Sequence, residues 1–208
     1  KDLGFKGENF GVYPGGGGYE IPSKEELFKH HKNIILVKGY QHTFGRGLIV
    51  IKALENLITQ IDQSGLKVIV FASHPEVIEY IKHKALPFKI YSRHELSHKG
   101  ILSVMKSTSI YIGNSISDGI PNTLIEAIVN GAFPIQSNPG GASEEIIKNG
   151  ENGFLINDPN SKEEIKFLIM RVLSNKSLLE KAYAINSTLV RQFEKNLIKR
   201  EIVKSYYK

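Results

Sequence analysis

The sequence has 208 residues, of which 41% are hydrophobic and 23% are charged, and this is enough chain for one globular domain with a full core. It contains no cysteine, which excludes disulfides, thiolate metal sites and thiol chemistry. Its net charge of +6 is scattered, without a run of five or six basic residues, so we expect no nucleic-acid partner. No stretch of about 18 apolar residues occurs, so the sequence predicts no membrane-spanning helix.

Residues 1–32 are punctuated by glycine and proline and show no sustained apolar period, which is typical of a connecting segment. Within this segment, Ser23 and Glu26 match a capping box, which predicts a short helix over Lys24–His31. The chain begins without an initiator methionine or a signal-peptide pattern, and we expect it to be an excised piece of a longer protein. Residues 33–208 are expected to form the folded domain.

From Asn33 onward, short β-branched runs alternate with amphipathic stretches, which is typical of strand-helix units. The runs predict strands buried on both faces at Ile34–Val37, Val68–Phe71, Phe88–Tyr91, Ile110–Ile112 and Phe133–Ile135. Right-handed crossovers would assemble these units into a parallel sheet. We therefore predict the α/β class, with a Rossmann-like doubly wound parallel sheet and helices on both faces.

Apolar residues recur at helical spacing between Val50 and Ile61, and Gly65 follows where a helix would end, which predicts one crossover helix. Ser161 and Glu164 match a second capping box, and helices are expected from about residue 161 to the end. The other helices are predicted at Pro75–Lys84, Glu95–Met105, Thr123–Asn130 and Ser143–Lys148.

In open α/β sheets, ligands bind beyond the carboxyl ends of the strands, so the loops that follow the strands are the candidate sites. The loop after the first strand contains Gly39, Gly45, Arg46 and Gly47 and opens the first crossover helix. Its glycines would let backbone amides approach a phosphate, and the guanidinium could bind phosphate oxygens bidentately. A turn with an exposed arginine is the alternative interpretation.

The loop after the fourth strand places Asp118 eight positions before Glu126, with the first in the loop and the second one turn inside the next helix. Free amides at the helix start form a candidate anion site, and carboxylates beside it could accept hydrogen bonds from sugar hydroxyls. These amides belong to Asn122, Thr123 and Leu124. A capped helix with solvated acidic residues is the alternative.

The loop after the fifth strand contains Gly140 and Gly141 and leads to Ser143, which would cap a short helix; in isolation this is an ordinary structural turn. His94 and His98 are four positions apart, as metal ligands on a helix can be, but no third ligand is evident nearby. We therefore predict no metal site and interpret both histidines as exposed helix residues.

Taken together, the loops resemble glycosyltransferase family 4, a group of retaining enzymes with the two-domain GT-B fold. The resemblance rests on an acidic residue, seven residues and then Glu-Ala, which here run from Asp118 to Glu126-Ala127. It continues through Gly131-Ala132-Phe133-Pro134 and Gly140-Gly141 to Glu144 or Glu145, and it covers roughly residues 33–157.

The resemblance implies that Glu126 holds the ribose hydroxyls of a nucleotide sugar and that Asp118 holds the transferred sugar. The diphosphate would bind the amides of residues 122–124, and Arg46 would carry most of the opposing charge, helped by Lys38 or His42. Arg93 stands where the base-binding loop of the family begins. Two departures are that Asp118 replaces the usual Glu and that Tyr40 replaces an arginine of the family.

By this resemblance the chain is the donor-binding half of a GT-B glycosyltransferase of hexosyltransferase type, inactive alone, with its acceptor-binding domain upstream. The implied donor is UDP-, GDP- or ADP-linked, without a metal or a separate cofactor, in cell-surface polysaccharide or glycolipid synthesis. The implied location is the cytoplasm, with the missing domain reaching a membrane surface or a lipid-linked acceptor. The alternatives are a nucleotide-binding or scaffolding module without turnover and a GT-B nucleotide-sugar epimerase.

Overall fold

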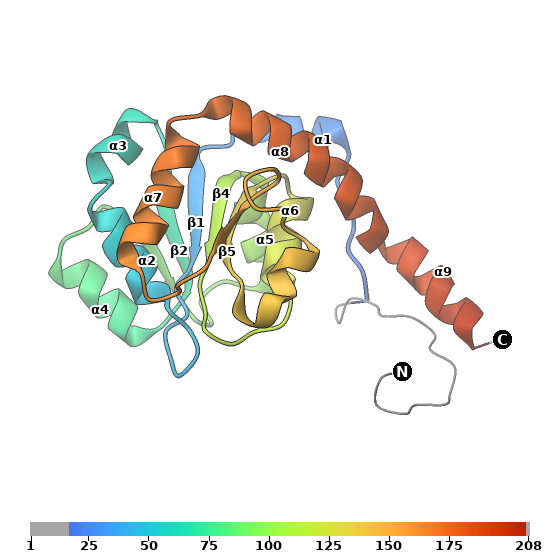
Figure 1. Ribbon diagram of the computed structural model, residues 1–208, viewed down its shortest axis with the longest axis horizontal. Coiled ribbons are helices and arrows are strands. Elements are labelled where there is room, and N and C mark those ends of the chain that lie inside the picture. Colours follow the sequence, from blue (N-terminus) through green and yellow to red (C-terminus); the bar gives the residue numbers. More distant parts are fainter. Residues whose placement is uncertain (1–16, 207–208) are drawn as a thin grey trace.

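The computed structural model describes residues 17–206, apart from the side chains of Phe28 and Lys29 (Figure 1). Its centre is a six-stranded sheet in the order β3-β2-β1-β4-β5-β6, in which every neighbouring pair is parallel. The strands are β1 (Ile34–Lys38), β2 (Lys67–Ser73), β3 (Lys89–Ser92), β4 (Thr108–Gly113), β5 (Phe133–Ser137) and β6 (Phe154–Ile156). This is the strand order of a Rossmann-like doubly wound sheet, so the predicted fold class is confirmed.

Helices cover both faces of the sheet, with α2, α4 and α7 on one side and α5 and α6 on the other, while α8 crosses its amino-terminal edge (Figure 1). The helices are α1 (Lys24–Lys29), α2 (Gly47–Glu55), α3 (Ile58–Gln63), α4 (Pro75–His83), α5 (His98–Lys106), α6 (Asn122–Val129), η1 (Pro139–Glu145), α7 (Lys162–Leu173), α8 (Lys176–Leu189), η2 (Val190–Phe193) and α9 (Lys195–Ser205). No helix in the described part of the chain is long and apolar enough to cross a membrane.

The two cores follow from the alternation of side chains along each strand. In β1, Ile35 and Val37 pack into the core with α2, α4 and α7, whereas Leu36 points to the opposite core with α5 and α6. The central strand β4 is buried throughout and contributes to both cores. Strands that face two apolar layers read as continuous hydrophobic runs, which explains why the sequence identifies them.

The sheet departs from the prediction at its two edges. The strand β3 is only partly covered, with Lys89 and Ser92 exposed, because it is an edge strand beside β2 alone; the prediction of burial on both faces is wrong there. At the other edge, the buried strand β6 was not predicted. It pairs with β5 through the register Ile135 to Phe154.

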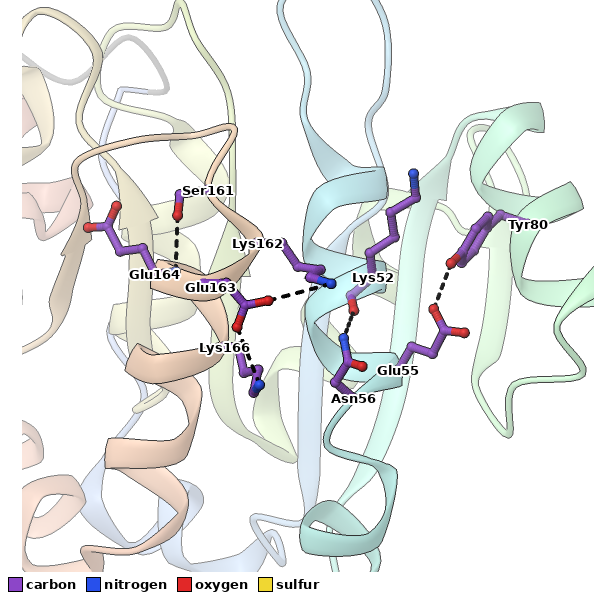
Figure 2. A network of polar contacts seen from close by, with 9 residues as sticks. All are labelled: Lys52, Glu55, Asn56, Tyr80, Ser161, Lys162, Glu163, Glu164 and Lys166. Carbon is purple, nitrogen blue, oxygen red and sulfur yellow. Dashed lines mark hydrogen bonds and ion pairs between the residues drawn. The ribbon is translucent and has the colours of Figure 1, made fainter.

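Three predicted helices differ in detail. The crossover helix after β1 is interrupted between α2 and α3, where the Asn56 side chain donates to the carbonyl of Lys52 (2.8 Å) and thus competes with helical backbone bonding (Figure 2). The helix predicted from Glu95 begins only at His98, where the Ser97 side chain caps it. The α-helix predicted at Ser143–Lys148 is instead the 3-10 segment η1.

The start of α7 also differs from the predicted capping box. The Ser161 hydroxyl accepts from the amide of Glu164 (3.1 Å), as expected (Figure 2). The Glu164 carboxylate, however, accepts from the amides of Asn157 and Asp158, both at 2.9 Å. Glu164 therefore fastens the loop after β6 to α7, and the reciprocal half of the box is not formed.

The structure describes the predicted connecting segment from residue 17, and its residues 1–16 lie outside the described residues. The capping box of Ser23 and Glu26 is formed, so the prediction of helix α1 is confirmed. Tyr19 pairs its backbone with the turn before α9: its amide donates to the Phe193 carbonyl (2.8 Å), and its carbonyl accepts from the Lys195 amide (3.0 Å). Helix α9 then extends away from the sheet (Figure 1).

Lys32 provides a pH-dependent stability test, because its ammonium donates to the carbonyl of Asn130 at the end of α6 and burial lowers its pKa from 10.5 to about 8. Between these two values the unfolded chain binds one more proton than the folded chain, so this site gains stability as pH rises. We expect wild type to gain on the order of 1 kcal/mol relative to Lys32→Met between pH 7 and 9.5. Urea unfolding at both pH values measures this gain, and Lys24→Met, at an exposed lysine, is the control. If the difference in free energy of unfolding between wild type and Lys32→Met does not change with pH, the prediction is wrong.

Candidate functional site

The loops after β1 and β4 meet at the carboxyl edge of the sheet, between two adjacent strands whose connections leave in opposite directions. Gly45 and Ser115 form an isolated antiparallel bridge, and the amide of Ile116 donates to the Phe44 carbonyl (2.8 Å). The amide of Arg46 donates to the Asn114 carbonyl (3.0 Å). This is the switch point at which doubly wound sheets bind ligands, and here the two loops are hydrogen-bonded to each other.

The glycines of the β1–α2 loop are required for its close packing. A Cβ on Gly45 would lie 2.5 Å from the Tyr40 carbonyl oxygen, and one on Gly47 would lie 2.9 Å from both that oxygen and the Gly39 carbonyl carbon. A Cβ on Gly39 would lie 2.7 Å from Val70 Cγ1. These three predicted phosphate-binding glycines therefore allow the loop to fold tightly onto itself and onto β2.

Arg46 is bound to its own loop. Its Nη1 donates to the carbonyls of His42 (3.3 Å), Thr43 (3.2 Å) and Gly45 (2.8 Å), and its Nε donates to Asn160 Oδ1 (2.9 Å). Its Nη2 donates to no acceptor within residues 17–206. The side chain thus supports the loop while one edge of the guanidinium stays available to a ligand.

The first amides of α2 are already used, because Gly47 donates to the Tyr40 carbonyl (2.9 Å) and Leu48 donates to the Gln41 side chain (3.1 Å). An anion at this loop would therefore meet the charge of Arg46 and not a row of open amides. The interpretation of this loop as a cradle of glycine amides is wrong for these positions.

The start of α6 offers open amides. Pro121 precedes the helix, and the amides of Asn122 and Thr123 donate to no acceptor in the part of the chain that the structure describes. The amide of Leu124 donates to the Pro121 carbonyl (3.0 Å), so it is less open than the other two. Two of the three predicted amides are therefore open to a ligand at the positive end of the helix dipole. Asp118 lies in the exposed loop before them.

Glu126 is buried one turn inside α6, with 8% of its surface exposed. Its Oε1 lies 2.7 Å from Nε2 of His98, the first residue of α5. The prediction that His98 is an exposed helix residue is confirmed, because its side chain is 68% exposed. Its imidazole nevertheless contacts the buried carboxylate of Glu126. A partner two elements away leaves no signal in sequence spacing.

Two tyrosines bond the first residues of α6 near the carboxylates. Tyr111 is fully buried and its hydroxyl lies 2.9 Å from Thr123 Oγ1; burial raises its pKa, and the Asp118 and Glu126 carboxylates raise it further. The Tyr19 hydroxyl donates to Asn122 Oδ1 (3.0 Å), and burial followed by the charge of Glu126 raises its pKa to about 12. Both phenols are therefore neutral hydrogen-bonding groups at neutral pH.

The carboxylates line separate hollows. Glu126 and His98 line one of about 660 Å³ that runs between α5 and α6 beneath residues 18–22. Asp118 lines a small one of about 50 Å³ at the ends of β1, β4 and β5. A broader hollow of about 1020 Å³ lies along α4 and contains none of the predicted site residues.

The remaining predicted residues lie on neighbouring loops. Gly140 and Gly141 adopt φ of 67° and 79°, a left-handed conformation that favours glycine, and both are exposed after β5. The Asn138 side chain, and not Ser143, caps this turn by accepting from the amides of Ser143 (3.0 Å) and Glu144 (3.3 Å). Arg93 is exposed in the turn after β3.

Comparison with known families decides the classification. The model of the family "Glycosyl transferases group 1" matches residues 20–188, which include all six strands and the loops that carry Arg46, Asp118 and Gly140. The chain belongs to the glycosyl transferases group 1 family. The match begins within the connecting segment and ends in α8.

Relatives of this group 1 chain are longer than it is. An uncharacterized glycosyltransferase of Methanocaldococcus jannaschii is 29% identical over 168 residues, which are 76% of this chain and 40% of the relative. The Anabaena protein HepE, solved with UDP and glucose, superposes with a TM-score of 0.70 at 17% identity, over 91% of this chain and 55% of its own. The chain therefore spans about half the length of these relatives, and the structural likeness shows the fold.

A third neighbour has similar extent. The C-terminal domain of LpcC, a group 1 family protein of Francisella tularensis, superposes with a TM-score of 0.65 at 20% identity, over 88% of this chain and 97% of its own. The fold places Arg46, Asp118 and the first amides of α6 at the carboxyl edge of the sheet. Glu126 lies one turn further along α6. His98, Tyr19 and Tyr111 come from other elements, and sequence spacing does not indicate that they lie beside Glu126 or the start of α6.

Proposed function

We propose that this chain is the donor-binding, C-terminal domain of a retaining family 4 glycosyltransferase of hexosyltransferase type, which transfers a sugar from a nucleotide-diphosphate sugar. Residues 1–32 would connect it to an acceptor-binding domain, and residues 33–208 would bind the donor. The observation that carries the proposal is Glu126: a buried carboxylate at the carboxyl edge of the sheet, held by His98 and paired with no lysine or arginine in the described chain.

The proposed task of Glu126 is to bind the ribose of the nucleotide. His98 fixes Oε1, and a carboxylate has further acceptor sites, so the two ribose hydroxyls can donate to the remaining lone pairs. Charged acceptors form stronger hydrogen bonds than neutral ones, and partial burial strengthens them further. We propose UDP as the first nucleotide to test, because HepE was solved with it, with GDP and ADP as the alternatives.

The diphosphate would lie between the loop after β1 and the loop after β4, which are hydrogen-bonded to each other. The free amides of Asn122 and Thr123 and the dipole of α6 would bind the diphosphate from one side, and the Nη2 edge of Arg46 would bind it from the other. These groups would stabilise the negative charge that grows on the phosphate when the bond to the sugar breaks. Lys38, at the end of β1, adds a second positive charge nearby.

The transfer would take place above Asp118, which is exposed and can accept hydrogen bonds from the sugar. The acceptor hydroxyl would attack the anomeric carbon from the side that the phosphate leaves, and a leaving phosphate oxygen would take the acceptor proton. The sugar would then keep its anomeric configuration. Because the acceptor would bind to the upstream domain, we propose that the chain alone binds the donor without turnover.

The biological setting of the proposal is the synthesis of cell-surface polysaccharide or glycolipid at the inner face of the cytoplasmic membrane. Membrane contact, and contact with a lipid-linked acceptor, would be made by the upstream domain. Gly140, Gly141 and Arg93 are proposed to border the donor, because they lie on the loops after β5 and β3 at the same edge of the sheet.

Arg46→Ala tests the proposal at the phosphates. We expect this variant to bind UDP about 10- to 100-fold more weakly than wild type, since a charged hydrogen bond contributes about 1.5–3 kcal/mol. Binding of uridine, which lacks the phosphates, should change little. Titration calorimetry with both ligands measures the difference, with the exposed Arg191→Ala as the control.

A second readout separates charge from loop structure. Arg46→Lys keeps the charge but cannot hold the three loop carbonyls and Asn160 together. A thermal melt therefore reports the loss of loop contacts for both variants, and UDP affinity reports the loss of charge for Arg46→Ala. Unchanged UDP binding in Arg46→Ala, in a variant that is still folded, would contradict the proposed place of the diphosphate beside Arg46.

A further inference from the structure

The small hollow of about 50 Å³ is a polar cavity built from three strand ends. Lys38 ends β1, Gly113 ends β4 and Gln136 lies near the end of β5, while the loop with Asn114 and Asp118 forms its wall. The volume is too small for a sugar ring but admits one or two water-sized groups. Two residues that line it, Asn114 and Gln136, each have a buried side-chain oxygen without a hydrogen-bond partner in the described part of the chain.

Asn114 is 5% exposed, and both protons of its Nδ2 are used. They point to the carbonyls of Pro159 (2.8 Å) and Arg46 (3.3 Å), which fixes the orientation of the amide. Its Oδ1 is thereby directed away from these carbonyls, and it has no hydrogen-bond partner within the described residues. The hydrogen bonds of Nδ2 therefore fix the position of Oδ1, while Oδ1 itself accepts no hydrogen bond from the described residues.

Gln136 is 2% exposed and is the second such residue. Its Nε2 donates to Ser137 Oγ (3.3 Å), and its Oε1 likewise has no partner within the described residues. A Cβ on Gly113 would lie 2.2 Å from that Oε1 and 2.9 Å from the Tyr111 hydroxyl. Glycine at position 113 therefore leaves the space in which the Gln136 amide lies.

Burying an unpartnered amide oxygen costs about 1–3 kcal/mol, and such groups are rare in folded proteins. Two such residues, Asn114 in the loop after β4 and Gln136 in β5, line the same cavity, which indicates a site that is completed by a hydrogen-bond donor. Anions do not fit two carbonyl-type oxygens beside the Asp118 carboxylate, and a metal cation is disfavoured by the Lys38 ammonium that lines the same cavity. A neutral hydroxyl donates one hydrogen bond and can accept another, so it can donate to one of the two oxygens and accept from the lysine.

We propose that Asn114 and Gln136 form a hydroxyl-recognition subsite that selects the sugar of the donor. One hydroxyl or hydroxymethyl group of the sugar enters the cavity beside Asp118 and donates its single proton to Gln136 Oε1, and Asn114 Oδ1 is the acceptor for a second donor. The inference rests on the proposed function and extends it, because it assigns donor selection to residues inside the sheet edge. A site that hydrogen-bonds a hydroxyl discriminates strongly against ligands that lack it.

Gln136→Met tests the subsite, because methionine keeps the length of the side chain and removes the acceptor. The 208-residue chain is titrated with UDP, GDP and ADP, and with their glucose, galactose, mannose and N-acetylglucosamine conjugates. We expect the best nucleotide sugar to bind about 3- to 10-fold more weakly to Gln136→Met, while its nucleoside diphosphate binds as to wild type. The matched control is Gln60→Met on the exposed face of α3.

Singly deoxygenated sugars identify the hydroxyl. Wild type should lose affinity for one deoxy sugar, and Gln136→Met should bind that sugar and its parent equally. The melting temperature of Gln136→Met should not fall, because the variant removes an unsatisfied buried acceptor. A merely structural glutamine would instead lower the melting temperature and weaken the diphosphate and the nucleotide sugar alike, which would overturn the inference.

The other outcomes separate the inference from the proposed function. If nucleoside diphosphates bind but no conjugate depends on Gln136, the cavity holds only water and the inference is wrong while the donor-domain proposal stands. If none of the three nucleotides or their sugars binds, the donor-domain proposal fails and the inference fails with it.

Discussion

Glu126→Ala is expected to weaken nucleotide binding by about 10- to 100-fold, an effect as large as that expected for Arg46→Ala. The carboxylate is buried and is held by His98, so its oxygens are oriented before the ligand arrives. Removing it would take away the charged acceptor that we propose for the two ribose hydroxyls. Titration calorimetry with the nucleotide that binds wild type measures the loss.

The chemical signature of this role is a dependence on the ribose. Wild type should discriminate between UDP and its 2′- and 3′-deoxy analogues, whereas Glu126→Ala should bind all three alike. Glu126→Gln keeps the shape and the contact with His98, so it separates loss of charge from loss of packing. Glu163→Ala, an exposed acid on α7, is the control. Equal UDP affinity in wild type and Glu126→Ala would refute the assignment.

Gly47→Ala is expected to destabilise the domain by about 1–3 kcal/mol, which is the usual cost of overpacking. The added Cβ would lie 2.9 Å from the Gly39 carbonyl carbon and 2.9 Å from the Tyr40 carbonyl oxygen. Both contacts are with backbone, which cannot rotate away as a flexible side chain would. The loop after β1 must open, and its bridge to Ser115 weakens with it.

Gly100→Ala is the matched control for that experiment. Gly100 lies inside α5, and a Cβ there would be no closer than 3.5 Å to Leu96 or Ser97, an ordinary contact. Alanine should therefore be neutral or stabilising by up to about 1 kcal/mol. Urea unfolding of the two variants measures both values, and similar stabilities for the two would show that the β1–α2 loop tolerates a Cβ.

The sequence predicts the centre of the fold well because burial on both faces leaves a simple record. The run Ile110–Ile112 and the run Ile34–Val37 are apolar at every position, which only a central strand requires. The sequence does not predict the strand at Phe154–Ile156, because three residues are too few to show a period. The 3-10 turn after β5 depends on left-handed glycines and on the Asn138 side chain, where local geometry overrides helical pattern.

The site was predictable as a set of loops but not as a set of contacts. The spacing of Asp118 and Glu126 places one in a loop and one in the helix, and the structure has them there. No spacing indicates that His98 would reach Glu126 from another helix, or that the Arg46 guanidinium would hold three carbonyls of its own loop. Such contacts depend on how separate elements pack, which the order of residues alone does not encode locally.

The central claim is that this chain binds the nucleoside diphosphate part of a nucleotide-diphosphate sugar. Its most direct test is calorimetric titration of the 208-residue chain with UDP, GDP and ADP, repeated on Glu126→Ala. We predict saturable binding of one nucleotide at one site per chain, weaker binding of the other two, and loss of the signal in the variant. Binding of none of the three to the folded wild-type chain, or binding that Glu126→Ala leaves intact, would contradict the account.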